Sequence, residues 1–121
     1  MRRTVRETAI LLAVLLKRSE QTRARVSEKT IRVVGRRSRL KAAFVVALRD
    51  ELEEFGWSLV ELPSGGFGAI QTSTLEAAKS VTALKYLTPE EAKGLRSGKM
   101  TTADFEAEAY PDDEEDAADD E

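Results

Sequence analysis

Basic side chains recur between positions 29 and 49, at spacings that bring several of them to one side of two consecutive helices. The residues concerned are Lys29, Arg32, Arg36, Arg37, Arg39 and Arg49. Lys and Arg neutralise phosphates and release counterions, and an Arg can also bind a guanine edge through two hydrogen bonds. The pattern therefore favours binding of a polyanion, with the option of reading bases, over an ordinary solvated surface.

Two helices in close succession would hold these side chains. Ser27 is a good N-cap for a first helix that ends near Arg37. Ser38 is a second N-cap, and a helical pattern over residues 40–55 follows it and stops at Gly56. Two helices joined this tightly must meet at a steep angle, as they do in a helix-turn-helix.

Helical periodicity separates an inner from an outer side on both helices. Lys29, Arg32 and Arg36 lie on one side of the first helix, roughly opposite Ile31 and Val34. On the second helix the inner stripe is Leu40, Phe44, Ala47, Leu48, Leu52 and Phe55, and the outer side is Arg39, Ala42, Val46, Arg49 and Glu53.

The outer side of the second helix changes character along its length. Its first turns are basic and small, whereas residues 50–54 are mostly acidic and would be repelled by phosphate. Ala42 and Val46 are short and apolar, which suits contact with a thymine methyl group, although they could instead form a dimer seam. A recognition helix places its N-terminal part in the major groove, and the charge gradient predicts that orientation.

A strand, a turn and a strand follow, over 57–62, 63–66 and 67–71. A helix-turn-helix with a hairpin directly behind it resembles the winged helix family of DNA-binding domains, here over residues 4–71. The resemblance implies that the hairpin is a wing that touches the DNA backbone or minor groove. Because its tip carries no Lys or Arg, that contact would fall to Ser64 or to backbone N–H groups.

Three residues of this region have structural interpretations. Gly35 lies inside the first predicted helix, where it either costs about 1 kcal/mol relative to Ala or marks an earlier turn. Trp57 and Phe67 are predicted to anchor the hairpin to the core rather than to stack on bases.

The N-terminus superficially matches a signal peptide, because Arg2 and Arg3 precede the apolar run Ala9–Leu16. That run is too short to span a bilayer, an acidic residue interrupts the charged region, and no small-residue cleavage site follows. We expect a mostly buried first helix over about 4–19, and then a linker over 21–26 with a short extended piece.

Local signals place further helices after the hairpin. Thr74 would cap a helix over 75–85, and Thr88 followed by Pro89 is a strong start for another that stops around Gly98. One more turn is predicted to end at Phe105.

The net charge of −3 hides a strong polarity along the chain. Residues 1–49 contain 14 Lys and Arg against three Glu, whereas residues 104–121 contain 11 Asp and Glu and no basic residue. A basic body with an acidic tail is a pattern met in nucleic-acid-binding proteins. The tail either competes with phosphate for the basic surface or is a solubilising or partner-binding segment.

Composition excludes several kinds of chemistry. The chain has 121 residues, 41% of them hydrophobic, and contains neither Cys nor His. Disulfides, thiolate nucleophiles, zinc sites and His-dependent catalysis are thereby excluded. With no nucleotide motif either, we expect a protein that is not an enzyme, needs no metal or cofactor, and lies in the reducing cytoplasm.

The sequence predicts a mainly α fold with a small β-hairpin. It divides into a winged helix-turn-helix-like three-helix core (1–71), a helical extension (72–103) and a disordered acidic tail (104–121). The resemblance implies a bacterial or phage transcriptional regulator that binds specific sites on double-stranded DNA, as a homodimer, with residues 39–55 as recognition helix and no membrane association. The alternative is an antitoxin- or inhibitor-like protein-interaction module that uses the outer side of that helix and the acidic tail.

Overall fold

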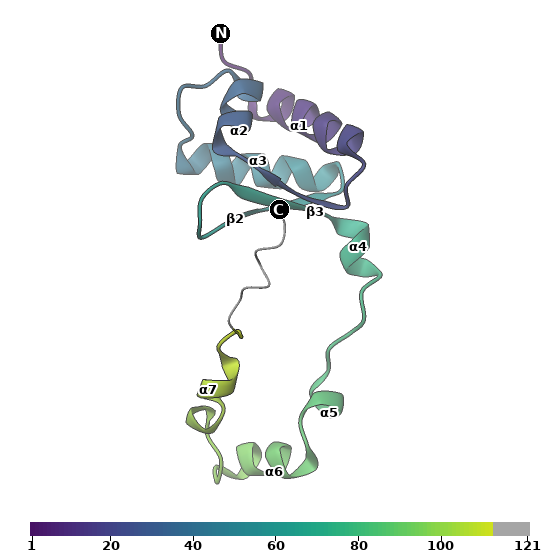
Figure 1. Cartoon of the computed structure of the whole chain (residues 1–121), viewed down its shortest axis with the longest axis vertical. Coiled ribbons are helices and arrows are strands. Elements are labelled where there is room, and N and C mark those ends of the chain that lie inside the picture. Colours follow the sequence, from purple (N-terminus) through teal and green to yellow (C-terminus); the bar gives the residue numbers. More distant parts are fainter. Residues whose placement is uncertain (113–121) are drawn as a thin grey trace. The chain divides into compact units, whose positions relative to one another are not determined.

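A computed structural model describes residues 1–112 of the chain. Residues Met1–Ala78 form one compact unit, mainly helical with a small antiparallel sheet. Its elements are α1 (Val5–Ser19), β1 (Arg23–Val26), α2 (Glu28–Gly35), α3 (Ala42–Glu54), β2 (Trp57–Glu61), β3 (Phe67–Gln71) and α4 (Thr72–Glu76) (Figure 1).

Helices α1, α2 and α3 pack on one face of the sheet and enclose the core (Figure 1). The core residues are Ala9, Leu12 and Leu16 of α1, Ile31 of α2, Phe44, Val45, Leu48 and Leu52 of α3, and Val26, Trp57, Leu59, Phe67 and Ala69 of the strands. Trp57 and Phe67 are only 4% and 5% exposed, which confirms that they anchor the hairpin.

The sheet joins distant parts of the chain, because β3 lies between β1 and β2 in the order β1-β3-β2. Val26 of β1 pairs with Phe67 of β3, and Trp57 of β2 pairs with Gln71. The predicted hairpin is confirmed. The short extended piece predicted in the linker is the strand β1, which pairs with β3 and forms one edge of the sheet.

The predicted starts of the first two helices are also confirmed. The Thr4 side chain accepts a hydrogen bond from the backbone N–H of Glu7, whose carboxylate accepts one from Thr4 in return, so that the two form a capping box. The Ser27 hydroxyl accepts from the N–H of Thr30, 3.0 Å away, and caps α2.

The predicted turn between α2 and α3 was wrong in position and length. Helix α2 ends at Gly35 and not near Arg37, and α3 begins at Ala42 with Lys41 at the N-cap, so Ser38 is not a cap. A six-residue loop, 36–41, therefore replaces the tight turn. Within this loop the Arg37 side chain packs on Phe44, as described below, and Leu40 packs against the core, so the loop connects α2 to α3 where an earlier start of α3 was predicted.

Gly35, the last residue of α2, lies against α1. A Cβ there would come within 3.1 Å of the Thr8 hydroxyl oxygen, and Thr8 is completely buried. The absence of a side chain at this position thus lets the two helices approach closely.

The second unit begins at Lys79 and contains short elements: α5 (Ala83–Tyr86), α6 (Pro89–Ser97), η1 (Thr102–Asp104) and α7 (Glu106–Ala109). The predicted α6 is confirmed, with a capping box between Thr88 and Glu91 and a left-handed Gly98 at its end. The single turn predicted to end at Phe105 corresponds to η1.

The helix predicted over 75–85 was wrong. The chain forms α4, leaves helical geometry, and resumes in α5, which Thr82 caps by accepting from the N–H of Lys85. Leu75, Ala78, Val81 and Leu84 have the spacing of an apolar helical stripe, but Val81 and Leu84 are 84% and 94% exposed. Short helices depend on packing of such a stripe, and without it the helix does not persist.

The acidic tail was predicted to be disordered from residue 104, yet η1 and α7 lie within its first part. Residues 113–121 of the predicted tail lie outside the described residues.

Candidate nucleic-acid interface

Residues 29–49 form one continuous basic stretch that covers most of α2, the 36–41 loop and the first two-thirds of α3. It contains seven Lys and Arg residues and no acidic residue. Lys29, Arg36, Arg39 and Lys41 are exposed, and Arg32 is half-buried. We call these five residues the basic cluster. On α2 the buried Ile31 and Val34 lie away from them, as the periodicity predicted.

Arg36 has an unusual backbone conformation for its type. It occupies the left-handed region, with φ 54° and ψ 51°, and its N–H closes α2 onto the carbonyls of Arg32 and Val33. Helices commonly end this way, but usually with Gly, because a Cβ costs free energy there. The exposed Arg at this position therefore makes the protein less stable than Gly would.

Arg37 was predicted to contact DNA beside Arg36, but its side chain is engaged within the protein. Its guanidinium lies over the Phe44 ring, 3.7 Å from the centroid, and its Nη2 donates to the carbonyl of Arg3 at 2.8 Å. Burial lowers the pKa of Arg37, and the nearby charge of Arg2 lowers it further, although an Arg stays charged near neutral pH. Arg37 thus holds the loop against α3.

Arg3 completes this arrangement at the end of α2. Its Nη1 donates to the carbonyl of Val34 at 2.8 Å, and its backbone N–H donates to the carbonyl of Gly35 at 3.0 Å. Carbonyls at a helix C-terminus lack intrahelical partners and carry partial negative charge, which a cation stabilises. The N-terminal residues therefore fix the exit of α2 and the start of the basic loop.

The first turns of α3 are exposed and small. Ala42, Ala43 and Val46 face solvent, Val46 being 54% exposed. No side chain within the described part of the sequence caps α3, and the first turn holds no acidic residue. Its free N–H groups and the positive end of its dipole therefore add to the field of the basic loop.

The remaining predicted contact on α3, Arg49, is only partly accessible. It is half-buried, and its Nε is buried without a hydrogen-bond partner among the described residues. Arg49 lies at the boundary between the small and the acidic parts of α3.

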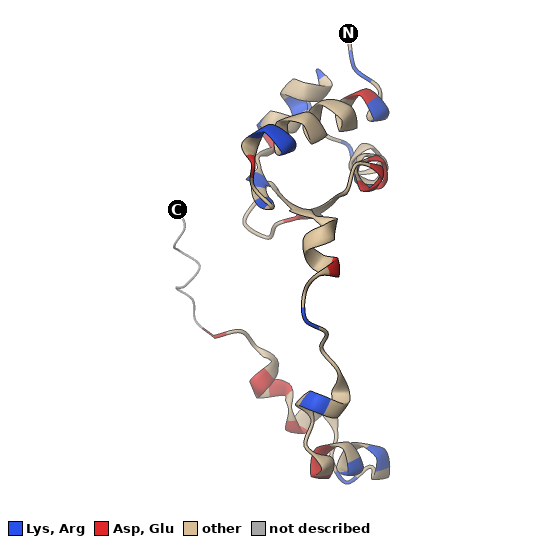
Figure 2. Ribbon diagram, turned by 90° about the vertical axis from the view of Figure 1, so that its right-hand side faces the viewer, with Lys and Arg blue, Asp and Glu red and all other residues tan. Residues whose placement is uncertain are grey.

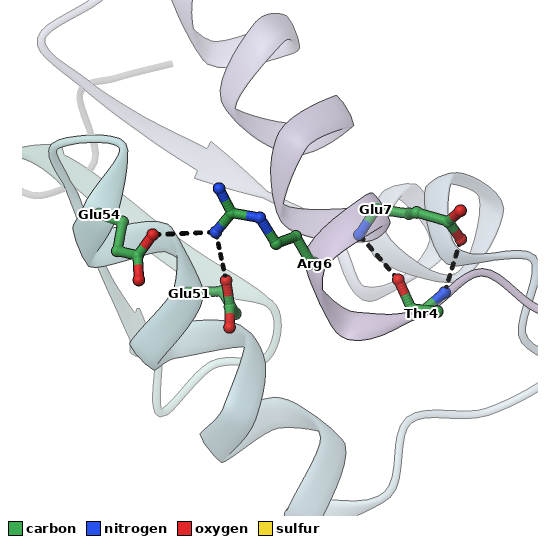
Figure 3. A network of polar contacts seen from close by, with 5 residues as sticks. All are labelled: Thr4, Arg6, Glu7, Glu51 and Glu54. Atoms are coloured by element: carbon green, nitrogen blue, oxygen red, sulfur yellow. Dashed lines mark hydrogen bonds and ion pairs between the residues drawn. The ribbon is translucent and has the colours of Figure 1, made fainter.

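The acidic end of α3 is neutralised from α1. Arg6 Nη1 lies 2.9 Å from an oxygen of Glu51 and 2.9 Å from one of Glu54 (Figure 3). The Arg6 guanidinium also lies over the Phe55 ring. The hydrogen bond to Glu54, followed by that to Glu51, raises the pKa of Arg6. In Figure 2 this end of α3 is seen almost end-on, in red. The ion pairs explain how carboxylates are tolerated where they oppose the helix dipole.

The hairpin tip is exposed but lies beside carboxylates. Ser64 is exposed, and the turn has Gly65 and Gly66 at positive φ. An open groove of about 610 Å³ separates the tip from the start of α3, and Glu28 and Glu61 are among its lining residues. Phosphate would be repelled there, so the basic cluster, and not the hairpin, offers the favourable electrostatic surface.

Lys41 was not among the predicted contacts, because the sequence pattern placed it inside a helix. The structure puts this exposed cation at the N-cap of α3, next to the free N–H groups. Arg23 and Arg25 were also not singled out, yet both are exposed on the edge strand β1, just before α2. Alternation of charged and apolar residues over 23–26 was the available signal.

Residues 1–112 show no group of three or more carboxylates that could hold a metal ion. None of the helices in this range is both long and apolar enough to cross a membrane.

Comparisons of the chain with protein-family models, with curated protein sequences and with solved structures found no match.

Proposed function

We propose that residues 1–78 form a winged-helix-type domain that binds double-stranded DNA and acts as a transcriptional regulator. The observation that carries the proposal is the acid-free basic stretch 29–49, whose exposed cations surround the uncapped start of an exposed, small-residue helix surface. The order α1-β1-α2-α3-β2-β3, with β1 paired to β3, supports the winged-helix interpretation.

The mechanism follows from the placement of charge. The basic cluster binds the phosphates that flank a major groove, and the N-terminal half of α3 enters that groove. Ala42, Ala43 and Val46 allow close approach and can contact thymine methyl groups. The acidic end of α3 stays clear of the DNA backbone because the exposed Asp50 and Glu53 repel phosphate, whereas Glu51 and Glu54 are paired with Arg6.

Contacts from this cluster give a defined salt dependence. Each phosphate neutralised on duplex DNA contributes about −0.9 to the slope of log K against log salt concentration, so four to five contacts give a slope of about −4. A fourfold rise in salt, from about 50 to about 200 mM, then weakens binding roughly 200-fold.

The test is a titration of labelled duplex DNA with the full chain, followed by fluorescence anisotropy at several salt concentrations. Arg39→Gln is expected to flatten the slope by about one unit, whereas Lys93→Gln on α6 removes the same charge from the second unit and leaves the slope unchanged. Absence of binding at low salt, or a slope near zero, would refute DNA binding and favour the protein-interaction alternative.

A further inference from the structure

The outer side of α1 carries an apolar patch that the compact unit leaves uncovered. Thr8, Ala9, Leu12 and Leu16 face the core, while Ile10, Leu11 and Leu15 on the other side are 41%, 37% and 43% exposed. Single exposed aliphatic residues are ordinary, but adjacent ones on one helix indicate a surface that meets a partner.

The spacing of this patch is that of a helix-packing seam. Glu7, Leu11, Val14 and Arg18 follow one another at steps of four, three and four residues, and Ile10 and Leu15 flank them. Such spacing keeps one stripe facing a second helix over the whole length of α1. The stripe ends in an acid at the N-terminal side and a base at the C-terminal side.

We infer that this surface binds the same surface of a second copy of the chain, with the two α1 helices antiparallel. In a two-fold arrangement about the middle of α1, residues equally far from the centre meet. Glu7 then lies opposite Arg18 of the second copy, and Leu11 lies opposite Val14. The Glu7–Arg18 contact is attractive and occurs twice in the dimer, and the antiparallel helix dipoles add to it.

Charge complementarity thus favours a second copy of the chain, with its α1 antiparallel, as the partner of this surface. A parallel pair would place Glu7 against Glu7 and Arg18 against Arg18, which is repulsive at both ends. The side chains of Glu7 and Arg18 are exposed, and among residues 1–112 only one oxygen of the Glu7 carboxylate, the one that accepts from Thr4, has a hydrogen-bond partner.

The size of the surface predicts a weak and reversible dimer. Helix α1 has 15 residues and is therefore about 22 Å long. One such helix pair buries less than the roughly 800 Å² per partner of a standard stable interface. A Kd on the order of 10 to 100 μM follows, and the dimer is expected to dissociate on dilution.

Sedimentation equilibrium of the full chain without DNA, from about 5 to about 500 μM, tests the inference. Leu11→Lys is expected to weaken association at least tenfold, because each dimer contains the substitution twice. Val60→Lys is the matched control, since Val60 is also exposed (51%) but lies on β2. A chain that remains monomeric throughout, or a dimer indifferent to Leu11→Lys, would overturn the proposal.

A charge swap distinguishes this geometry from other dimers. Glu7→Arg makes both ends of the stripe positive, and Arg18→Glu makes both negative, so each variant alone is expected to associate about tenfold more weakly than the native chain. An equal mixture of the two is expected to regain native association, because both contacts are attractive again. Failure of the mixture to recover, with both variants folded by circular dichroism, contradicts the antiparallel pairing.

This inference is independent of the proposed DNA binding, since association is measured without DNA. Arg18→Glu and Leu11→Lys leave the capping box of α1 intact and keep the test valid if Glu7→Arg, which removes the acceptor for the Thr4 N–H, does not fold.

Discussion

Replacement of Arg36 by Gly is expected to stabilise the protein and to weaken its binding to DNA. The left-handed conformation of Arg36, at φ 54°, costs a residue with a Cβ about 1–2 kcal/mol. Gly removes that cost, but it makes the unfolded chain more flexible, and this conformational entropy lowers the stability of the folded protein by about 0.4–1 kcal/mol. The free energy of unfolding should therefore rise by about 0.5–1 kcal/mol.

The loss in binding follows from one phosphate contact. At about 0.1 M salt, the release of 0.9 counterion is worth about 1.2 kcal/mol, or roughly an eightfold change in Kd. Arg36→Gly should thus bind duplex DNA about eightfold more weakly and flatten the salt slope by about 0.9. Opposite changes in stability and affinity cannot result from general damage to the fold.

Two variants serve as controls. Arg36→Gln removes the charge but retains the Cβ, so binding should weaken equally while stability stays near the native value. Glu20 ends α1 in the same backbone conformation, with φ 60°, so Glu20→Gly should gain similar stability without losing affinity. Urea unfolding followed by the fluorescence of Trp57, the chain's single tryptophan, measures stability, and anisotropy measures binding. A less stable Arg36→Gly, or one with the native salt slope, would refute the reasoning.

Three further expectations concern neighbouring features. Arg37→Gln should lower the free energy of unfolding by about 1–2 kcal/mol, because it loses the contact with Phe44 and a charged hydrogen bond. The salt slope of DNA binding should stay unchanged, and a flattened slope would show that Arg37 contacts DNA after all. Gly35→Ala should lower the free energy of unfolding, measured with urea, by about 1 kcal/mol, because overpacking against Thr8 outweighs the better helix propensity of Ala. A second substitution, Thr8→Ala, should relieve this overpacking. A Gly35→Ala variant more stable than the native chain would contradict the close contact. Deletion of residues 112–121 removes eight acidic groups. Nonspecific DNA binding should then strengthen several-fold at low salt, with a smaller gain at physiological salt. Equal affinity of the native and shortened chains at low salt would exclude competition between the tail and DNA phosphate for the basic surface.

Elements whose signals are local could be predicted from the amino-acid sequence alone. The capping boxes at Thr4 and Thr88, the N-cap at Ser27 and the Gly65-Gly66 turn each depend on residues a few positions apart. The alternation of apolar residues in the hairpin also identified Trp57 as a core residue. These features were predictable because hydrogen bonds and sterics within one turn decide them.

Where those elements end and how they meet depends on contacts between residues far apart in the sequence. The close packing of α2 on α1 depends on the contact between Gly35 and Thr8, 27 positions earlier in the sequence. The late start of α3 depends on the packing of Arg37 on Phe44, and β1 exists as a strand only because β3 pairs with it. Local propensity contains no information about such partners, since they are brought together only when the helices and sheet pack.

The same division applies to the candidate interface. The sequence determined that residues 29–49 are basic and free of acids, and therefore that a positive surface exists. Only the packed structure separated the exposed Arg36 from the adjacent Arg37, and brought Arg6 to the acidic end of α3. Charge is a property of the residue type, but its availability to a ligand depends on which side chains the fold uses for itself.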